Sequence, residues 1–183
     1  MSNIVDIAAH TPCSKDDFFF DCNVWLFNFC PIGNYSKKQQ EIYSKFLNEA
    51  RQNRATIWVN SLVLSEFANR YLRLDFNLWV KSVESPSNAE YKKDYIGSKR
   101  YKLIVTHVEN AIRNILKLSE KTSDDFHRIG DNMDDVFLNF QQIDFNDSYY
   151  YEFCRRNNYT LVSDDQDFNK VPNNNVKVVT LVR

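Results

Sequence analysis

Three carboxylates stand within four positions, directly after a short apolar run near the C-terminal end of the chain. The stretch is LVSDDQDF, residues 161–168, and its acids are Asp164, Asp165 and Asp167. The same arrangement recurs upstream, where Asp21 follows the run FFF in FFFDCN. The whole chain carries a formal charge of only −1, so composition does not explain this local crowding. Two strand-like runs that each end in an acid suggest one shared site.

Two further segments carry acids that fit such a set. Glu66 lies in the helical stretch SLVLSEFANRYLRL, and Asp144 and Asp147 stand where a later helix begins. Each acid taken alone has an ordinary explanation. Asp21 fits a helix N-cap, Glu66 fits an i,i+4 pair with Arg70, and the other two suit the positive end of a helix. Only their convergence in space distinguishes a site from four unrelated acids.

A site that gathers several carboxylates needs positive charge to be stable. Two carboxylates about 4 Å apart repel by about 4 kcal/mol at an effective dielectric constant near 20. A hard divalent cation offsets that repulsion, and oxygen-only ligation suits Mg²⁺ or Mn²⁺. Such an ion lowers the pKa of a bound water, orients a phosphate and neutralises charge on the leaving oxygen. The acids therefore favour metal-dependent hydrolysis of phosphodiester bonds.

The segments between the acids predict the scaffold that positions them. Runs typical of strands stand at 18–20, 56–59, 159–163 and 176–182, with a further candidate at 136–143. Helical spacing or capping marks 23–29, 36–53, 61–74, 121–130, 146–158 and a long helix from Tyr101. Strands that alternate with helices indicate an α/β fold, a central parallel sheet flanked by helices on both faces. Sites in such sheets form beyond the carboxyl ends of the strands.

The 183 residues are expected to form one domain. We expect residues 1–16 to be a flexible or peripheral N-terminal segment and residues 84–100 to be an inserted polar loop. No stretch is long and apolar enough for a membrane span or a signal peptide. The four cysteines form no CxxC pair, which favours reduced thiols in a cytoplasmic protein.

The order of these motifs resembles the PIN domain, a compact parallel α/β nuclease fold that includes the toxin ribonucleases of bacterial toxin–antitoxin pairs. The family's first motif, a strand running into Asp-Thr-Asn-Val-Leu, stands here as DCNVW at 21–25. Its helical Ser-Glu-Leu/Phe stands as SEF at 65–67. An Asp that opens a helix, followed by a strand ending in Val-Thr-x-Asp-x-Asp-Phe, corresponds to the unit from Asp147 to Phe168.

The resemblance implies particular roles for the acids. It assigns catalysis to four residues, Asp21, Glu66, Asp147 and Asp165. It also implies that the same four residues bind Mg²⁺ or Mn²⁺. It adds Asp167 as a fifth metal-binding acid. Asp164 falls on a variable position of the family pattern, and Asp144 is interpreted as a helix cap.

The resemblance also identifies polar residues beside the acids. Asn23 and Ser163 match positions that orient the carboxylates or hold water. Cys22 departs from the family pattern, because Thr or Ser usually stands there and would supply a hydrogen-bonding hydroxyl beside Asp21. No His accompanies this thiol, so cysteine catalysis is not indicated.

One stretch has the character of a nucleic-acid contact. Residues 92–102, KKDYIGSKRYK, hold five bases and one acid, with tyrosines between them. The candidate RNA contacts are Lys92, Lys93, Lys99, Arg100 and Lys102. Such a stretch can hold a phosphate backbone and stack unpaired bases, although a solvated loop and helix start explains it equally well. Residues 120–147, with eight acids and two bases, are expected to face away from nucleic acid, apart from Asp147.

Together these features predict a divalent-metal-dependent endoribonuclease that acts on single-stranded or looped RNA. Two alternatives stay open: a catalytically weak or inactive PIN-like scaffold that binds RNA or protein, which Cys22 favours, and a nuclease that cleaves DNA flaps or single strands. Expected partners are RNA, an antitoxin protein if the chain is a toxin, and a second copy in a homodimer, but no membrane. The chain is longer than the small toxins of the family, mostly around residues 84–122, so the toxin role also stays open.

Overall fold

Six short strands pair in one all-parallel sheet within the described part of the chain. The computed structural model describes residues 3–131, 133–171 and 175–182. The strand order across the sheet is β1-β6-β5-β2-β3-β4. The strands are β1 (Ile4–Asp6), β2 (Asp17–Phe20), β3 (Thr56–Val59), β4 (Glu120–Lys121), β5 (Thr160–Val162) and β6 (Val178–Thr180). Because all of them run in one direction, their carboxyl ends lie along the same edge of the sheet.

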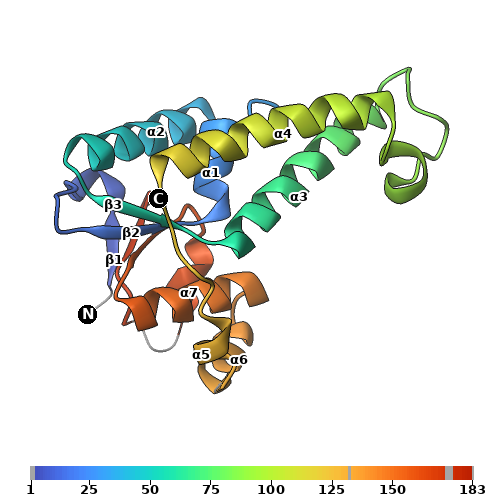
Figure 1. Ribbon diagram of the computed structural model, residues 1–183. Helices are drawn as coiled ribbons and strands as arrows, with labels where there is room; N and C mark the ends of the chain where they lie inside the picture. The colour runs from blue at the N-terminus through green and yellow to red at the C-terminus, as the bar shows by residue number, and fades with distance from the viewer. Residues whose placement is uncertain (1–2, 132, 172–174, 183) are drawn as a thin grey trace.

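Helices cover both faces of the sheet (Figure 1). The long ones are α1 (Cys22–Phe29), α2 (Lys37–Gln52), α3 (Ser61–Trp79), α4 (Lys99–Leu118) and α7 (Phe145–Asn157). Short ones are α5 (Phe126–Ile129), α6 (Asp134–Phe140), the 3-10 turns η1 (Ile7–Ala9) and η3 (Gln166–Lys170), and the π-helical turn η2 (Tyr91–Tyr95). The helices α1 and α2 lie on one face, and α7 lies on the other with α5 and α6 beside it.

The run FFF in β2 is buried on both faces of the sheet, as expected for a central strand of a parallel sheet. Successive side chains alternate between the faces. Phe19 packs against Phe153 of α7, with ring centroids 4.9 Å apart. Phe18 packs against Phe46 of α2 at 5.3 Å, on the opposite face. This packing fixes the end of β2, and with it the position of the residue that follows.

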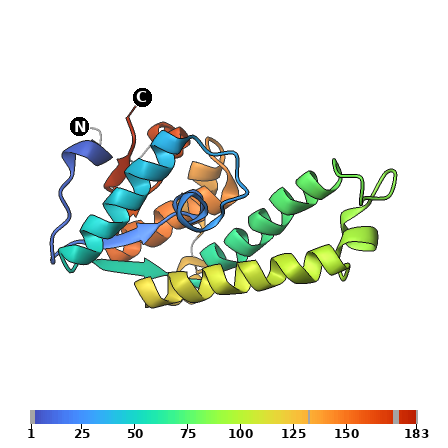
Figure 2. The same cartoon turned by 90° about the horizontal axis from the view of Figure 1, so that it is seen from above.

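The helices α3 and α4 pack side by side as a long hairpin that extends beyond the sheet (Figures 1 and 2). Its far end carries η2 and a small core of its own, in which Trp79 and Tyr95 contact each other. The carboxylate of Asp75 is fully buried there. It accepts hydrogen bonds from the Tyr95 hydroxyl at 2.8 Å and from the guanidinium of Arg100. Arg100 therefore joins the start of α4 to the C-terminal part of α3.

The α/β fold and the four principal strands predicted from the sequence are confirmed. The strand predicted at 136–143 is wrong, because α6 occupies most of that range. Its buried residues Val136, Asn139 and Ile143 recur at helical spacing rather than in alternation. The short strands β1 and β4 were not predicted, and β4 consists of two exposed residues without an apolar pattern.

The expected peripheral N-terminal segment and the expected polar loop each contain a short element of secondary structure. Residues 4–6 of the N-terminal segment form β1, which pairs with β6 at the edge of the sheet. Residues 84–100 contain η2, and they end in the first turn of α4, which the side chain of Ser98 caps. In the described ranges, no helix combines the length and the apolar character required to cross a lipid bilayer.

Candidate active site

Two of the predicted acids follow neighbouring strands at the carboxyl edge of the sheet. Asp21 comes directly after β2 and caps α1, where its carboxylate accepts from the backbone N–H of Cys22. Its own backbone N–H donates to Val162 of β5 at 3.0 Å. Asp165 lies three residues beyond β5 and caps the turn η3. The pairing of β2 with β5 therefore brings the two loops together, although their acids are far apart in the sequence.

The other two acids come from helices that flank this edge. Glu66 lies in α3, and Asp147 lies in the first turn of α7. The two helices are joined directly, because one oxygen of Glu66 accepts from the Tyr150 hydroxyl at 2.7 Å and from Asn146 Nδ2 at 3.2 Å. The other oxygen of Glu66 pairs with Arg70 at 3.3 Å. Tyr150 and Asn146 thus fix the orientation of Glu66.

The electrostatics of Asp147 show that all four acids share one environment. Burial raises the pKa of its carboxyl to about 9, and the negative charges of Asp21, Asp144, Asp165 and Glu66 contribute to the rise. Burial likewise raises the pKa of Asp21 to about 7, against the hydrogen bond from Ser163, and the charge of Glu66 adds to the rise. The structure therefore brings Asp21, Glu66, Asp147 and Asp165 into mutual repulsion at one site.

A small hydrogen-bond network holds Asp21 and the loop after β5 in place. The hydroxyl of Ser163 donates to Asp21 at 2.7 Å. It accepts from Asn23 Nδ2 at 3.2 Å and from the backbone N–H of Asp165 at 3.0 Å. Asn23 also accepts from the backbone N–H of Asp164 at 3.3 Å. These contacts connect Asn23 and Ser163 to Asp21 and to the loop after β5, and the roles that the resemblance implies for them stay predictions.

The remaining acids of the stretch 164–167 point to other partners. Asp167 is half exposed and pairs with Lys170 at 2.6 Å, while its backbone N–H donates to Asp165. Asp164 faces α2, where it accepts from the hydroxyl of the buried Tyr43 at 3.1 Å and from Gln39. Asp144 caps α7, as interpreted from the sequence. A metal-binding role for Asp167 stays a prediction.

Several residues of the site were not identified from the sequence. Tyr150 was not among the residues predicted for the site, although it stands three residues after Asp147 and therefore on the same helical face. Tyr43 donates to the backbone carbonyl of Ser163 at 3.0 Å and accepts from the N–H of Leu181 at 3.1 Å. No local pattern distinguishes this tyrosine from an ordinary core residue of an amphipathic helix.

The candidate RNA contacts lie away from the acids, around the outer end of the α3–α4 hairpin (Figure 1). Lys92, Lys93, Lys99 and Lys102 are exposed there. Arg100 is different, because its guanidinium binds the buried Asp75. The structure therefore gives Arg100 a role within the fold, in place of the free phosphate contact expected from the sequence. RNA contact by the four lysines stays a prediction.

The chemistry of the acids fits a divalent cation. The Asp147 carboxylate is largely buried among other acids, and the described residues give it no hydrogen bond or ion pair. Carboxylate oxygens are the ligands that Mg²⁺ and Mn²⁺ prefer. Over the described ranges, however, no three His, Cys, Asp or Glu side chains stand close enough together to hold an ion. The acids are gathered at one site without ligating distances between them.

The raised pKa values predict an unusual pH dependence of stability. A carboxyl whose pKa is higher in the folded than in the unfolded chain stabilises the fold below its unfolded pKa, and that stability is lost as the pH rises through the folded pKa. The pKa values of about 7 for Asp21 and about 9 for Asp147 place this loss between pH 4 and pH 9. We therefore expect the free energy of unfolding in EDTA to fall from pH 7 to pH 8.5, by up to about 1.4 kcal/mol per pH unit for each proton.

Urea denaturation at each pH measures this dependence. Repeating the series in excess Mg²⁺ provides the control, because a bound cation stabilises the ionised carboxylates and should flatten or reverse the slope. A stability that rises with pH in EDTA would contradict the arrangement of the acids described above.

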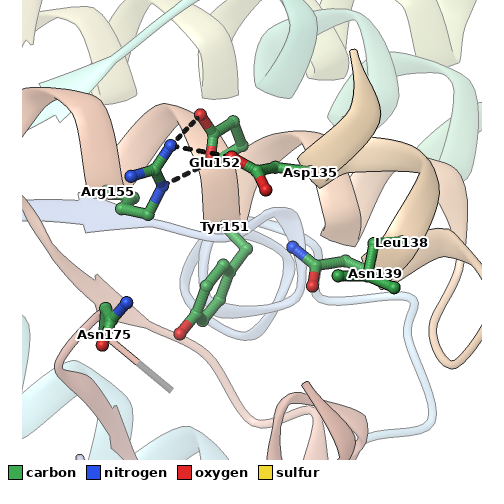
Figure 3. Close-up of a pocket in the computed structure, with 7 residues that line it drawn as sticks. All are labelled: Asp135, Leu138, Asn139, Tyr151, Glu152, Arg155 and Asn175. Carbon is green, nitrogen blue, oxygen red and sulfur yellow. Dashed lines mark hydrogen bonds and ion pairs between the residues drawn. The ribbon is translucent and has the colours of Figure 1, made fainter. Parts of the chain in front are cut away.

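A hollow lined partly by charged side chains lies outside the candidate active site (Figure 3). Its centre is the buried carboxylate of Glu152, which pairs with Arg155 at 2.6 Å and also with Arg156. Asp135 of α6 pairs with the same Arg155 at 3.1 Å. Every charge of this cluster has a partner, and none of the four predicted acids lines the hollow. We interpret it as an ionic link between α6 and α7 that stabilises the fold.

Comparison with known proteins agrees with the fold and the motifs. A family model for the PIN domain matches residues 18–174, a range that includes every acid of the candidate site. The chain belongs to the PIN domain family. PIN domains are generally nucleases, and they generally use divalent metal ions. A search of the curated proteins finds no match.

A solved structure has a similar fold. It is a chain of the crystal structure of VapBC2 from Rickettsia felis bound to a DNA fragment from their promoter. The two chains are 16% identical, with a TM-score of 0.54, and the match covers 90% of this chain and 98% of that one. At this identity the likeness supports the fold alone.

Proposed function

We propose that this protein is a divalent-metal-dependent endoribonuclease that cleaves single-stranded RNA. Its catalytic residues are Asp21, Glu66, Asp147 and Asp165. The observation that carries the proposal is the position of these acids at the carboxyl edge of the sheet, where Asp147 is buried and its pKa is raised by burial and by the charges of Asp21, Asp144, Asp165 and Glu66. Carboxylates that repel one another in a partly buried site destabilise the fold, and a bound cation would offset that repulsion. Hydrogen bonds also orient two of these carboxylates, as a binding site requires.

The chain's own residues have distinct tasks in this proposal. Asp21, Glu66, Asp147 and Asp165 would hold Mg²⁺ or Mn²⁺, which when bound supplies an acidified water and neutralises charge on the leaving oxygen. Ser163 keeps the Asp21 carboxylate in one orientation. Tyr150 and Asn146 do the same for Glu66. The products expected from the family resemblance carry a 5′-phosphate and a 3′-hydroxyl.

A toxin role within a toxin–antitoxin pair is the biological setting that we propose. The support is the similar fold of a chain from a VapBC toxin–antitoxin complex. An antitoxin protein would then be the natural partner of this chain, and a segment of it would cover the acidic site. The DNA in that complex belongs to the other protein and gives no substrate for this one.

The alternative of an inactive binding scaffold loses its main argument in the structure. Cys22 removes the hydroxyl usual in the family, and its buried thiol has a raised pKa because of burial. Nevertheless, Asp21 accepts hydrogen bonds from the backbone N–H of Cys22 and from Ser163. The carboxylate is therefore oriented without a hydroxyl at position 22, and this favours an active enzyme.

Cleavage of an unstructured RNA oligomer tests the proposal. Wild type should cut the RNA with Mg²⁺ or Mn²⁺ and should be inactive in EDTA, and Asp21→Asn should be inactive in all three. Asp144→Asn is the matched control, since it keeps a good N-cap on α7 and should cleave within a few-fold of wild type. A matched DNA oligomer decides the sugar preference. Cleavage that is unaffected by EDTA, or no cleavage of RNA at all, would refute the proposal.

A further inference from the structure

The outer face of α3 continues from the candidate active site as a row of polar and basic side chains. Glu66, Arg70 and Arg73 stand at i, i+4 and i+7, which places them on one side of the helix. An open hollow of about 300 Å³ lies along this row. Its lining residues are Leu62, Ser65, Glu66, Asn69, Arg70, Arg73 and Asn146. Glu66 and Asn146, which belong to the active site, thus also line a hollow that contains two arginines.

Arg70 stands at the border between the acids and the hollow. Its guanidinium lies 3.3 Å from Glu66, and its side chain is 49% exposed. A guanidinium has five N–H donors, and the contact with Glu66 leaves most of them available. Arg70 can therefore bind a phosphate on its outer side while it stays next to the active site.

Arg73 extends the row by almost one turn of the helix. Its guanidinium carbon lies 3.8 Å from the centre of the Tyr91 ring in η2, so the far end of the hairpin folds back to hold it. Within the described residues, no carboxylate pairs with Arg73, and its charge is exposed. An arginine stacked on an aromatic ring keeps its N–H groups free at the edge, in the fork that matches a phosphate.

A simple helix-stabilising pair is the alternative explanation of Arg70. The chain contains such a pair for comparison on α4, where Arg113 and Glu109 have the same i,i+4 spacing and a shorter distance of 2.6 Å. That pair is more exposed on both sides than the pair of Arg70 with Glu66. It also lines none of the hollows described above. Arg70 differs in standing between the acids and a hollow that a second arginine also lines.

We propose that Arg70 and Arg73 form a phosphate-binding subsite that holds the RNA strand beside the scissile bond. The inference rests on the proposed nuclease function and identifies residues that bind its substrate. The α-helical rise puts Arg73 about 10 Å from Glu66 along the helix axis, so the strand would run from the acids toward the far end of α3. The subsite also places cationic groups next to an acidic centre that would otherwise repel RNA.

RNA binding measured in an inactive background tests the subsite. Asp21→Asn serves as the parent, and the fluorescence anisotropy of a labelled, unstructured RNA oligomer gives Kd at several salt concentrations in Mg²⁺. Adding Arg70→Ala and Arg73→Ala should weaken binding at least about 10-fold. It should also reduce the slope of log Kd against log salt by about 1.4, because each lost phosphate contact on a single strand removes about 0.7. Arg113→Ala in the same background should change neither quantity.

The outcomes separate this inference from the proposed function. If wild type cleaves RNA and the double variant keeps the affinity and the salt slope of its parent, the subsite is wrong and the nuclease stands. If the two substitutions lower cleavage when introduced into the otherwise wild-type chain but leave the salt slope of the inactive background unchanged, Arg70 only orients Glu66, and this also overturns the subsite. If wild type neither binds nor cleaves RNA, both proposals fail.

Discussion

Replacing Asp147 with Asn will reduce RNA cleavage at least about 100-fold and will make the metal-free protein more stable at pH 8. The size of the loss is that expected when one preorganised electrostatic group is removed from an active site. Stability is expected to rise while activity falls, because Asp147 is buried among acids and its pKa is raised. At pH 8 the buried carboxyl keeps its proton in the folded chain and ionises on unfolding, which favours the unfolded chain. Asn is neutral in both states, so the variant does not carry this cost.

The gain should grow with pH. Near pH 5 the wild-type carboxyl and the amide differ little, and the difference should increase toward pH 8. Initial rates on an unstructured RNA oligomer and urea denaturation in EDTA measure the two effects. Asp144→Asn is the matched control for the cleavage rates, because Asp144 caps the same helix from an exposed position. A variant that loses stability and activity together would identify Asp147 as a structural residue.

Arg100→Ala will lower the free energy of unfolding by about 3–5 kcal/mol, the cost of breaking a buried ion pair by removing one partner. The guanidinium of Arg100 binds both oxygens of Asp75, which is fully buried in the hairpin. Without Arg100, the Tyr95 hydroxyl is the one donor that the described residues still offer to this carboxylate. A buried charge with so little compensation is costly.

Urea denaturation measures this loss, and Lys99→Ala is the neighbouring control. Lys99 is exposed at the first position of α4, so its removal should change stability by no more than about 0.5 kcal/mol. Asp75→Asn combined with Arg100→Leu should recover part of the lost stability, because it removes both charges together. If Arg100→Ala leaves the stability unchanged but weakens RNA binding, Arg100 is a substrate contact after all.

The acidic site was the most predictable part of this molecule, for a physical reason. Acids at the ends of parallel strands reach one edge wherever the strands pair, so the short runs before Asp21 and Asp165 were sufficient to place them. Glu66 and Asp147 needed the family resemblance, because nothing in a helical pattern shows which neighbour it packs against. The structure then supplied that neighbour in the contact between Glu66 and Tyr150.

Predictions about Arg100 and β4 were wrong or missing because pairing between segments far apart in the sequence leaves no local signal. Arg100 stands in a basic stretch and resembles a phosphate contact, but its partner Asp75 lies 25 residues away on another helix. The strand β4 has no signal of its own, since it forms only because β3 offers an open edge. The exposed Phe137 and Phe140 of α6 made a helix resemble a strand, because an apolar outer face conceals the helical period.

The central claim is that four acids are gathered because a divalent cation binds between them. Crystals grown in MnCl₂ and measured near the manganese absorption edge test this claim most directly. We predict an anomalous peak in contact with carboxylate oxygens of Asp21 and Asp147, with Glu66 and Asp165 bound directly or through water, and no such peak in Asp147→Asn crystals. A wild-type map without manganese among these four carboxylates would contradict the account.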